Sequence, residues 1–231
     1  MSMKMRLMAL LSLLGMVLPV AACAQEAGEG DPAGEAAAED TVRDAEVAVE
    51  PAAPTNVYGD SMPHPTVTLN TSHGEIRIEL FPEEAPVSVE NFLAYVEGGH
   101  YDGLIFHRVI PNFMIQAGGH LPDMTPREAT RPEITNESDN GLHNLRGTVA
   151  MARTPEPHSA RAQFFINLVD NPNLDHRGTD GGWGYAVFGR VIDGMDVVDE
   201  IARQPTGNAA GAQNVPREAI VIETAERGDD I

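Results

Sequence analysis

Alternating apolar and polar residues dominate the chain from residue 63 onward. In the runs 66–70 and 75–80 every second residue is apolar, and Ser72-His73-Gly74 lies between them. A period of two places successive side chains on opposite faces of a strand, so this stretch predicts a β-hairpin with a short turn. The same pattern predicts further strands at 105–110, 113–117, 147–152, 163–168, 185–192 and 220–224.

Two stretches have helical spacing instead. Pro86 suits a first helical position, apolar residues recur at intervals of three and four up to Val96, and Gly98-Gly99 marks the end. A second helix is predicted from Met195 to Arg203. Together the strands and helices predict a mainly β fold, namely a closed eight-stranded antiparallel barrel capped by two α-helices.

The first residues have the composition of an export signal. Lys4 and Arg6 precede an apolar stretch, 7–20, that is shorter than the roughly 20 residues of a membrane-spanning helix. It ends in Val20-Ala21-Ala22-Cys23, where small residues precede the only cysteine of the chain. This pattern resembles a bacterial lipoprotein signal, in which the cysteine is lipidated and becomes the N-terminus. The alternative is ordinary cleavage, which would leave a soluble exported protein with a free thiol.

A signal peptide over 1–22 would be followed by a segment without a core. Residues 23–62 are rich in Ala, Glu, Asp, Pro and Gly and nearly lack large apolar side chains. Such a segment cannot bury enough surface to offset its ordering entropy, so an acidic, disordered linker is predicted. A short helix around 36–49 is the alternative, because Ala and Glu favour helix. The remaining residues, 63–228, suit one domain with a single core.

Charge and cysteine content exclude several classes of function. The formal net charge is −20, which argues against nucleic acid and against anionic membrane surfaces as direct ligands. A single cysteine excludes an intramolecular disulfide. The histidines lack the paired spacing of a metal site on a helix, and no nucleophile-elbow motif of a hydrolase is present. We therefore expect neither a metal nor another cofactor.

One long motif is more specific than these patterns. Residues 106–119, Phe-His-Arg-Val-Ile-Pro-Asn-Phe-Met-Ile-Gln-Ala-Gly-Gly, resemble the signature of cyclophilins. The segments 147–153, 162–167 and 185–189 resemble later strands of that family in the same order, and the likeness extends over nearly all of 64–226. It implies a cyclophilin-like barrel with peptidyl-prolyl cis/trans isomerase activity and proline-containing polypeptides as substrates. Within the family, the Ala-Met-Ala-Arg-Thr run is similar to bacterial, periplasmic-type members.

The implied chemistry needs no covalent step. Rotation about an X-Pro bond meets a barrier of about 18–20 kcal/mol because it breaks amide resonance. A catalyst must therefore bind the twisted amide better than either planar form. The resemblance makes Arg108 the donor to the prolyl nitrogen, with Phe113 and Gln116 completing the catalytic set. Without the resemblance, the pattern would favour a surface arginine on an alternating strand at this position.

The resemblance also implies a substrate-binding set. Alternation along 113–117 places Phe113 and Ile115 on one face of the strand and Met114 and Gln116 on the other, so a pocket that uses both Phe113 and Met114 requires a local twist or Met114 at its rim. Ala152 and the backbone of Arg153 would line the groove for the residue before proline. The implied substrate-binding residues are Met114, Ala152, Arg153, Gln163, Phe165, Leu174 and Tyr185.

Two positions depart from common family members. Asn173 stands where many eukaryotic members have Trp, which should weaken cyclosporin-type ligands. Tyr185 stands where many have His, and Tyr titrates near pH 10, so this position should add little pH dependence near neutrality.

Other functions and locations remain open at this level. A barrel that holds proline segments without turnover, or one that binds a small ligand, would share the same fold. The export pattern predicts a protein of the cell envelope that faces the periplasm, is tethered by lipid on Cys23 and acts in envelope-protein folding. A monomer is the default expectation, since no sequence pattern indicates an oligomer. Ala24 after the cysteine favours the outer membrane by analogy, and the alternative is a soluble periplasmic or secreted protein.

Overall fold

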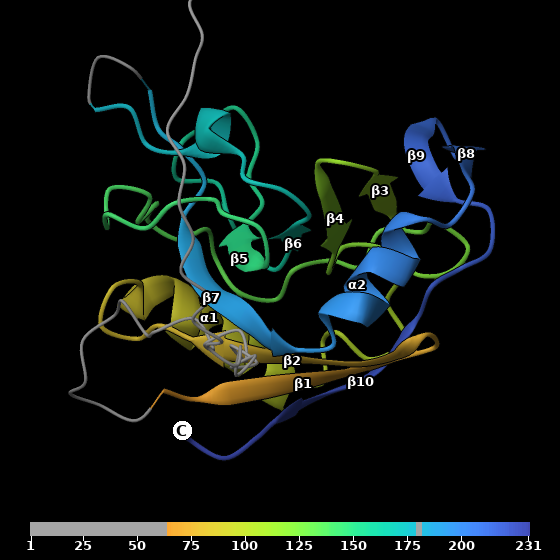
Figure 1. The fold of residues 1–231 in the computed structure, drawn as a ribbon, viewed down its shortest axis with the longest axis horizontal. Coiled ribbons are helices and arrows are strands. Elements are labelled where there is room, and N and C mark those ends of the chain that lie inside the picture. The colour runs from red at the N-terminus through yellow and green to blue at the C-terminus, as the bar shows by residue number, and fades with distance from the viewer. Residues whose placement is uncertain (1–63, 179–181) are drawn as a thin grey trace, which may run out of the picture. The chain divides into compact units, whose positions relative to one another are not determined.

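The computed structural model describes residues 64–178 and 182–231 (Figure 1). The expected signal peptide, the linker and Cys23 lie outside these residues. Within the described ranges, no helix is both long enough and apolar enough to span a bilayer.

One antiparallel sheet forms the framework of the described domain. Its eight strands run in the order β10-β1-β2-β7-β5-β6-β4-β3, and β8 pairs only with β9 in a separate hairpin. The strands are β1 (Thr66–Thr71), β2 (Gly74–Leu80), β3 (Arg108–Ile110), β4 (Met114–Ala117), β5 (Thr148–Met151), β6 (Phe164–Asn167), β7 (Val187–Asp193), β8 (Thr206–Ala209), β9 (Ala212–Pro216) and β10 (Ile222–Arg227). The helices are α1 (Pro86–Glu97), α2 (Met195–Ala202) and the short 3₁₀ turn η1 (Pro172–Leu174).

The sheet curls so that its two edges approach each other. An antiparallel bridge joins Ile105 and Val221, and Ile222 N donates a hydrogen bond of 2.7 Å to Leu104 O. These contacts lie before β3 and before or at the start of β10, so the edges meet over a short length rather than along a full ladder. The prediction of a mainly β, eight-stranded antiparallel fold with two helices is confirmed as a curled half-barrel.

The core lies on the inner face of this sheet. Val109 of β3 pairs with Ile115 of β4, Ile115 pairs with Ile166 of β6, and all three are fully buried. Both helices contribute to the same core, α1 with Phe92 and α2 with Ile201. Since side chains alternate along a strand, the neighbours of these core residues must face outward.

The ends of several elements differ from the sequence prediction. The strand expected from residue 105 is paired as a named strand only at Arg108–Ile110. The β8–β9 hairpin was not predicted, because its sequences are rich in Gly, Asn, Gln and Ala, which carry little strand signal. The positive φ of Ala210 and Gly211 closes its turn.

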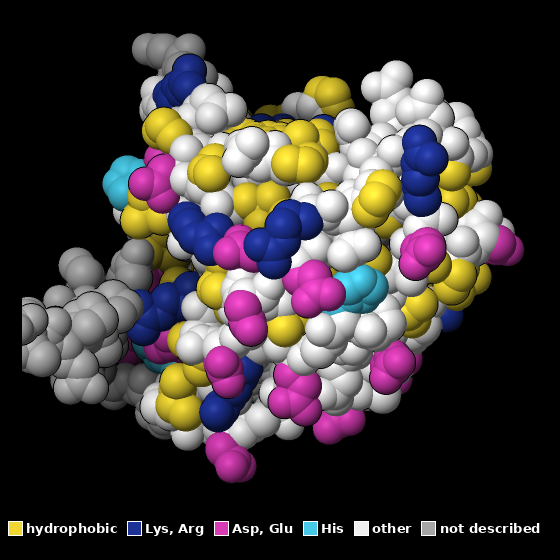
Figure 2. Space-filling model, turned by 45° about the vertical axis from the view of Figure 1, so that its right-hand side comes forward, with side chains coloured by type: hydrophobic (Ala, Val, Ile, Leu, Met, Phe, Trp, Pro, Cys, Tyr) yellow, Lys and Arg dark blue, Asp and Glu magenta, His cyan; other side chains and the backbone are white. Residues whose placement is uncertain are grey.

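Acidic and basic side chains are interspersed on the face shown in Figure 2. Figure 2 shows one face on which Asp and Glu side chains are spread widely, with the Lys and Arg side chains standing among them. Arginines on this face therefore do not merge into one continuous basic area.

Helix α1 is capped by a residue far away in the sequence. Its N-cap residue, Ala85, has no side chain that can cap. The carboxylate of Glu137 instead accepts hydrogen bonds from Val87 N at 3.0 Å, Ser88 N at 2.8 Å and Ser88 Oγ at 2.7 Å. Glu137 thus satisfies free backbone donors of the first turn and fastens the long 119–146 loop to the helix.

We predict that Glu137→Gln lowers the free energy of unfolding by about 1–2 kcal/mol, because charged acceptors at a helix start are worth about that much. Urea unfolding measures the change. Glu90→Gln, on the exposed side of the same helix, is the matched control and should change stability far less. Equal midpoints for the two variants would show that the cap contributes nothing specific.

Candidate active site

Cross-strand pairing gathers three predicted site residues on the outer face of the sheet. Arg108 of β3 lies opposite Gln116 of β4, and Gln116 lies opposite Phe165 of β6. Directly paired residues share a face of the sheet. Phe165 in turn lies opposite Ala150 of β5, so one row crosses four strands. Its members are held in place by the burial of their inward-facing neighbours.

A chain of side-chain hydrogen bonds orients the guanidinium of Arg108. Its Nη1 donates to Gln116 Oε1 at 3.3 Å, and Gln116 Nε2 donates to Gln163 Oε1 at 2.8 Å. Among the described residues, no carboxylate forms an ion pair with Arg108, so its positive charge is not neutralised there. The arrangement presents a fixed cationic donor at the surface of the sheet.

An apolar cluster outside the main core borders this donor. Its buried members are Phe81, Met114, Leu142, Ala150, Phe165 and Val187, and its partly buried members are Ile110, Phe113, Ala152, Leu174 and Tyr185. The ring of Tyr185 meets that of Phe165 edge-on, with 5.5 Å between centroids. The cluster can therefore offer a nonpolar surface to a small ring, with partly exposed side chains around a buried floor.

Phe113 does not lie where simple alternation placed it. It belongs to the turn before β4, where Asn112 has a φ of 58° and Phe113 N donates to Ile110 O at 3.1 Å. Because the strand begins only at Met114, the pleat does not extend to Phe113. Its side chain joins Met114 in the outer cluster, whereas Ile115 lies in the core. The expectation that Phe113 and Ile115 share a face is wrong.

Buried asparagines support the walls of this cluster, and the sequence patterns did not identify them. Asn171 Nδ2 donates to Phe113 O at 3.0 Å and to Asn167 Oδ1 at 2.7 Å. Asn144 Nδ2 donates to Tyr185 O at 3.3 Å. Buried amides are costly unless hydrogen-bonded, so these bonds fix the backbone beside Phe113 and Tyr185. The one available signal was Asn167 within the apolar run Phe-Phe-Ile-Asn.

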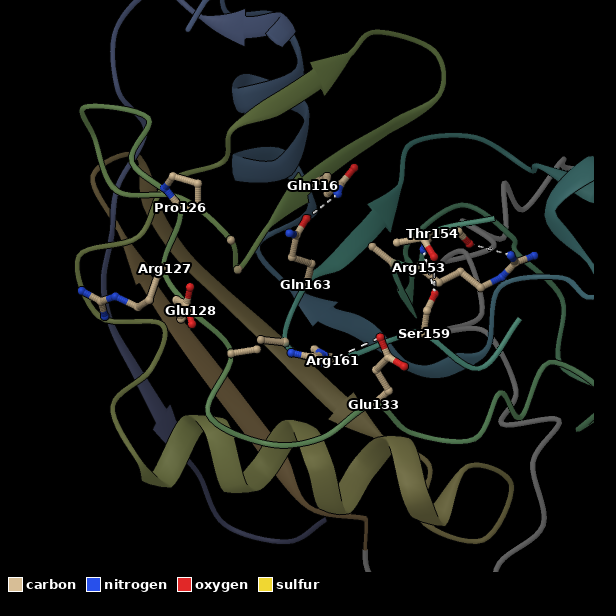
Figure 3. A pocket seen from close by; sticks show the side chains of 15 residues that line it. Gln116, Pro126, Arg127, Glu128, Glu133, Arg153, Thr154, Ser159, Arg161 and Gln163 are labelled. Atoms are coloured by element: carbon tan, nitrogen blue, oxygen red, sulfur yellow. Dashed lines mark hydrogen bonds and ion pairs between the residues drawn. The ribbon is translucent and has the colours of Figure 1, made fainter. Parts of the chain in front are cut away.

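An open groove of about 440 Å³ continues from the row of Arg108 (Figure 3). Gln116 and Gln163 face each other at one side of it, and the ion pair between Arg161 and Glu133 lies at another. A Cβ on Gly119 would stand 2.5 Å from Gln163 Nε2, so only glycine lets that amide pack there. The groove is lined by Gln116, Gly118, Gly119, Pro126, Arg127, Glu128, Ala129, Glu133, Ala152, Arg153, Thr154, Ser159, Arg161, Ala162 and Gln163.

All ten residues predicted for catalysis and substrate binding belong to the row of Arg108, to the groove or to the apolar cluster, and these three parts share residues. Arg108 is hydrogen-bonded to Gln116, and Gln116 lines the groove together with Gln163 and Arg153. Ala152 belongs to both the groove and the apolar cluster, so it joins the two parts. The remaining five are in the apolar cluster, namely Phe113, Met114, Phe165, Leu174 and Tyr185.

A pair of imidazoles includes the residue before Arg108 in the sequence. The rings of His107 and His120 have centroids 4.4 Å apart. Burial, and secondarily the neighbouring His120, lowers the pKa of His107 from 6.5 to about 4. His107 is therefore neutral at physiological pH. Within residues 64–178 and 182–231, no three His, Cys, Asp or Glu side chains gather as a metal site would require.

We predict that neutral His107 makes the fold sensitive to acid. Between pH 6.5 and about 4 the unfolded chain binds a proton that folded His107 does not, so stability falls as the pH falls through this window. The loss is of order 3 kcal/mol at most, since each unit of pKa shift is worth about 1.4 kcal/mol. His107→Gln should flatten the slope of unfolding free energy against pH in urea titrations.

His73→Gln, in the turn between β1 and β2, is the control and should keep the wild-type slope. An unchanged slope for His107→Gln would mean that His107 does not carry this proton linkage.

Known proteins with similar sequences and folds match this chain over the described domain. A family model described as "Cyclophilin type peptidyl-prolyl cis-trans isomerase/CLD" matches residues 66–227. A peptidyl-prolyl cis-trans isomerase of Streptomyces antibioticus is 60% identical over 162 residues, which cover 70% of this chain and 97% of that protein. Peptidyl-prolyl cis-trans isomerase B of Escherichia coli (strain K12) is 54% identical over 159 residues, 68% of this chain and 96% of that protein.

A solved structure agrees with these sequence matches. The crystal structure of a cyclophilin type peptidyl-prolyl cis-trans isomerase of Cryptosporidium parvum, in the presence of the dipeptide Ala-Pro, has a TM-score of 0.61 and 27% identity. The match covers 71% of this chain and 99% of the Cryptosporidium chain.

Proposed function

Because the chain belongs to the cyclophilin-type peptidyl-prolyl cis-trans isomerases and is itself an isomerase of X-Pro bonds, we propose that the row of Arg108, Gln116 and Phe165 is where the bond rotates. The single observation that carries this proposal is the placement of an unneutralised guanidinium beside a partly exposed apolar cluster. A proline ring needs the cluster, and its amide nitrogen needs the donor.

The donor acts on a state that exists only during rotation. As the amide twists, resonance is lost and the prolyl nitrogen gains a usable lone pair. A hydrogen bond from Arg108 to that nitrogen is stronger in the twisted state than in either planar state, which lowers the barrier. Gln116 holds the guanidinium in advance, so little reorganisation is required at the moment of rotation.

The cluster and the groove bind different parts of the substrate. The proline ring rests against Phe113, Leu174 and Tyr185, above the buried side chains of Met114 and Phe165. The residues before proline extend along Ala152 and the backbone of Arg153 into the groove, where Gln163 supplies a polar contact. The presence of Ala-Pro in the Cryptosporidium structure supports a proline-containing ligand of this kind.

We predict that Arg108→Ala lowers kcat/KM for an Ala-Pro peptide by about 10²–10³-fold, the usual effect of removing one preorganised donor. Arg108→Lys should recover only part of the rate, because an ammonium lacks the rigid fork that Gln116 holds. A protease-coupled assay or NMR exchange gives the rate. Arg227→Ala, whose arginine pairs with Glu97 on another part of the domain, should match wild type. Equal rates for Arg108→Ala and wild type would remove Arg108 from the mechanism.

The proposed cellular setting rests on the N-terminal sequence. Residues 1–22 would direct export, Cys23 would carry lipid, and 23–62 would tether the isomerase domain at the periplasmic face of the envelope, with the outer membrane favoured by Ala24. There the enzyme would assist envelope proteins, whose X-Pro bonds isomerise unaided in tens of seconds or longer. The acidic linker suits a tether because like charges keep it extended.

We predict that Cys23→Ser moves the protein from the membrane fraction to the soluble fraction while isomerase activity per molecule stays the same. Cell fractionation followed by the proline assay tests both statements. If wild type and variant are equally soluble, the exported protein has no lipid anchor. If both stay with the membrane, another segment holds them there.

A further inference from the structure

The side chain of Arg153 ties two loops together beside the substrate surface. Its Nε donates to Gly184 O at 3.0 Å and its Nη2 donates to Trp183 O. Its Nη1 donates to Thr154 O at 2.9 Å and to Pro155 O at 3.3 Å. One guanidinium thus binds four main-chain carbonyls, two in the loop after β5 and two in the loop before β7.

Neither loop is held there by a strand ladder. Gly184 packs so closely that a Cβ would stand 2.5–2.6 Å from the backbone of Leu174, Asp175 and His176. Its carbonyl also accepts a hydrogen bond of 3.1 Å from Asn136 Nδ2. The position of residues 183–184 is therefore set by side-chain bonds, and Arg153 supplies two of them.

The same guanidinium backs one wall of the apolar cluster. Arg153 Cζ lies 4.7 Å from the centre of the Tyr185 ring, and that ring meets Phe165 edge-on. Tyr185 N in turn donates to Leu174 O at 2.9 Å. Tyr185 is therefore fixed by the cation of Arg153, by Phe165 and by the backbone of Leu174.

The charge of Arg153 has no acidic partner in the part of the chain that the structure describes. Four carbonyls and one aromatic face compensate it instead, and these match the planar fork of a guanidinium. Arg153 also lines the groove, so it stands between the two halves of the proposed substrate surface. A residue needed only to join loops at the surface would have no reason to contact Tyr185.

We infer that Arg153 is a positioning residue, which acts through Tyr185 to hold the wall of the proline pocket ready before substrate arrives. This inference rests on the proposed site, and it adds a role for the side chain where only the backbone of Arg153 was assigned. A preformed pocket spares the ordering cost of binding, so its loss weakens the binding of planar and twisted prolines alike. Loss of the Arg153 side chain should therefore raise KM and leave kcat nearly unchanged.

The test combines Arg153→Ala, Arg153→Lys, Tyr185→Ala and the double variant of Arg153→Ala with Tyr185→Ala. Values of kcat and KM come from an NMR exchange assay on an Ala-Pro peptide. We expect Arg153→Ala to raise KM about tenfold with kcat within about twofold, since a partly desolvated cation–π contact is worth up to about one factor of ten. Arg153→Lys should not restore KM, because an ammonium cannot bind the four carbonyls together.

The effect of Arg153→Ala on KM, measured with and without the Tyr185 ring, distinguishes a positioning role from a merely structural one. In the Tyr185→Ala background, Arg153→Ala should change KM by less than about twofold, because its route of action has been removed. The emission of Trp183, the only tryptophan of the chain, should shift in Arg153→Ala, since its carbonyl loses its donor. Arg227→Ala is the control and should leave both readouts at wild type.

Three results would overturn the inference, namely a wild-type KM for Arg153→Ala, full rescue by Arg153→Lys, or effects that add fully in the double variant. If Arg153→Ala does not fold, KM is measured for Arg153→Lys instead. A wild-type KM for Arg153→Lys would then contradict the inference. Arg108→Ala, run beside these variants, keeps the two proposals apart. If Arg108→Ala lowers kcat while Arg153→Ala keeps a wild-type KM, the proposed site is supported and the proposed role of Arg153 is contradicted.

Discussion

The pleat of four neighbouring strands is the constraint on which the site depends. Val109, Ile115 and Ile166 can enter the core only if the residues beside them face outward. Arg108, Gln116 and Phe165 are those residues. A slip of one position would bury the guanidinium and expose the apolar side chains, so burial of the core enforces the register of the proposed catalytic row. The residues that stabilise the core and the residues of the proposed site thus lie on opposite faces of the same sheet.

The walls of the site are held by a different kind of interaction. Phe113, Leu174 and Tyr185 come from a turn, a 3₁₀ segment and a loop, none of which has a complete ladder of backbone bonds. Side chains that bind backbone groups replace the ladder, with Asn171 at Phe113 O and Asn144 at Tyr185 O. The sheet therefore supplies the donor and the floor, whereas polar side chains from distant segments fix the rest of the pocket.

Much of this could be predicted from the sequence because the responsible signals are local. Period two located β1, β2 and the strands around the site, and the motif at 106–119 indicated both the fold and Arg108. Alternation failed at Phe113, since a turn residue does not follow the pleat. Contacts such as Glu137 with α1, or Arg153 with Tyr185, join residues far apart in the sequence, and no periodic pattern records such pairs.

The central claim is that Arg108 prefers the rotating amide to the resting one. Line-shape analysis of a saturating X-Pro peptide by NMR separates the rate of interconversion on the enzyme from the dissociation constant. We expect Arg108→Ala to slow the on-enzyme rate by about two orders of magnitude or more while the dissociation constant changes by less than about threefold. An unchanged on-enzyme rate with a weakened dissociation constant would contradict this claim, because Arg108 would then only bind the substrate.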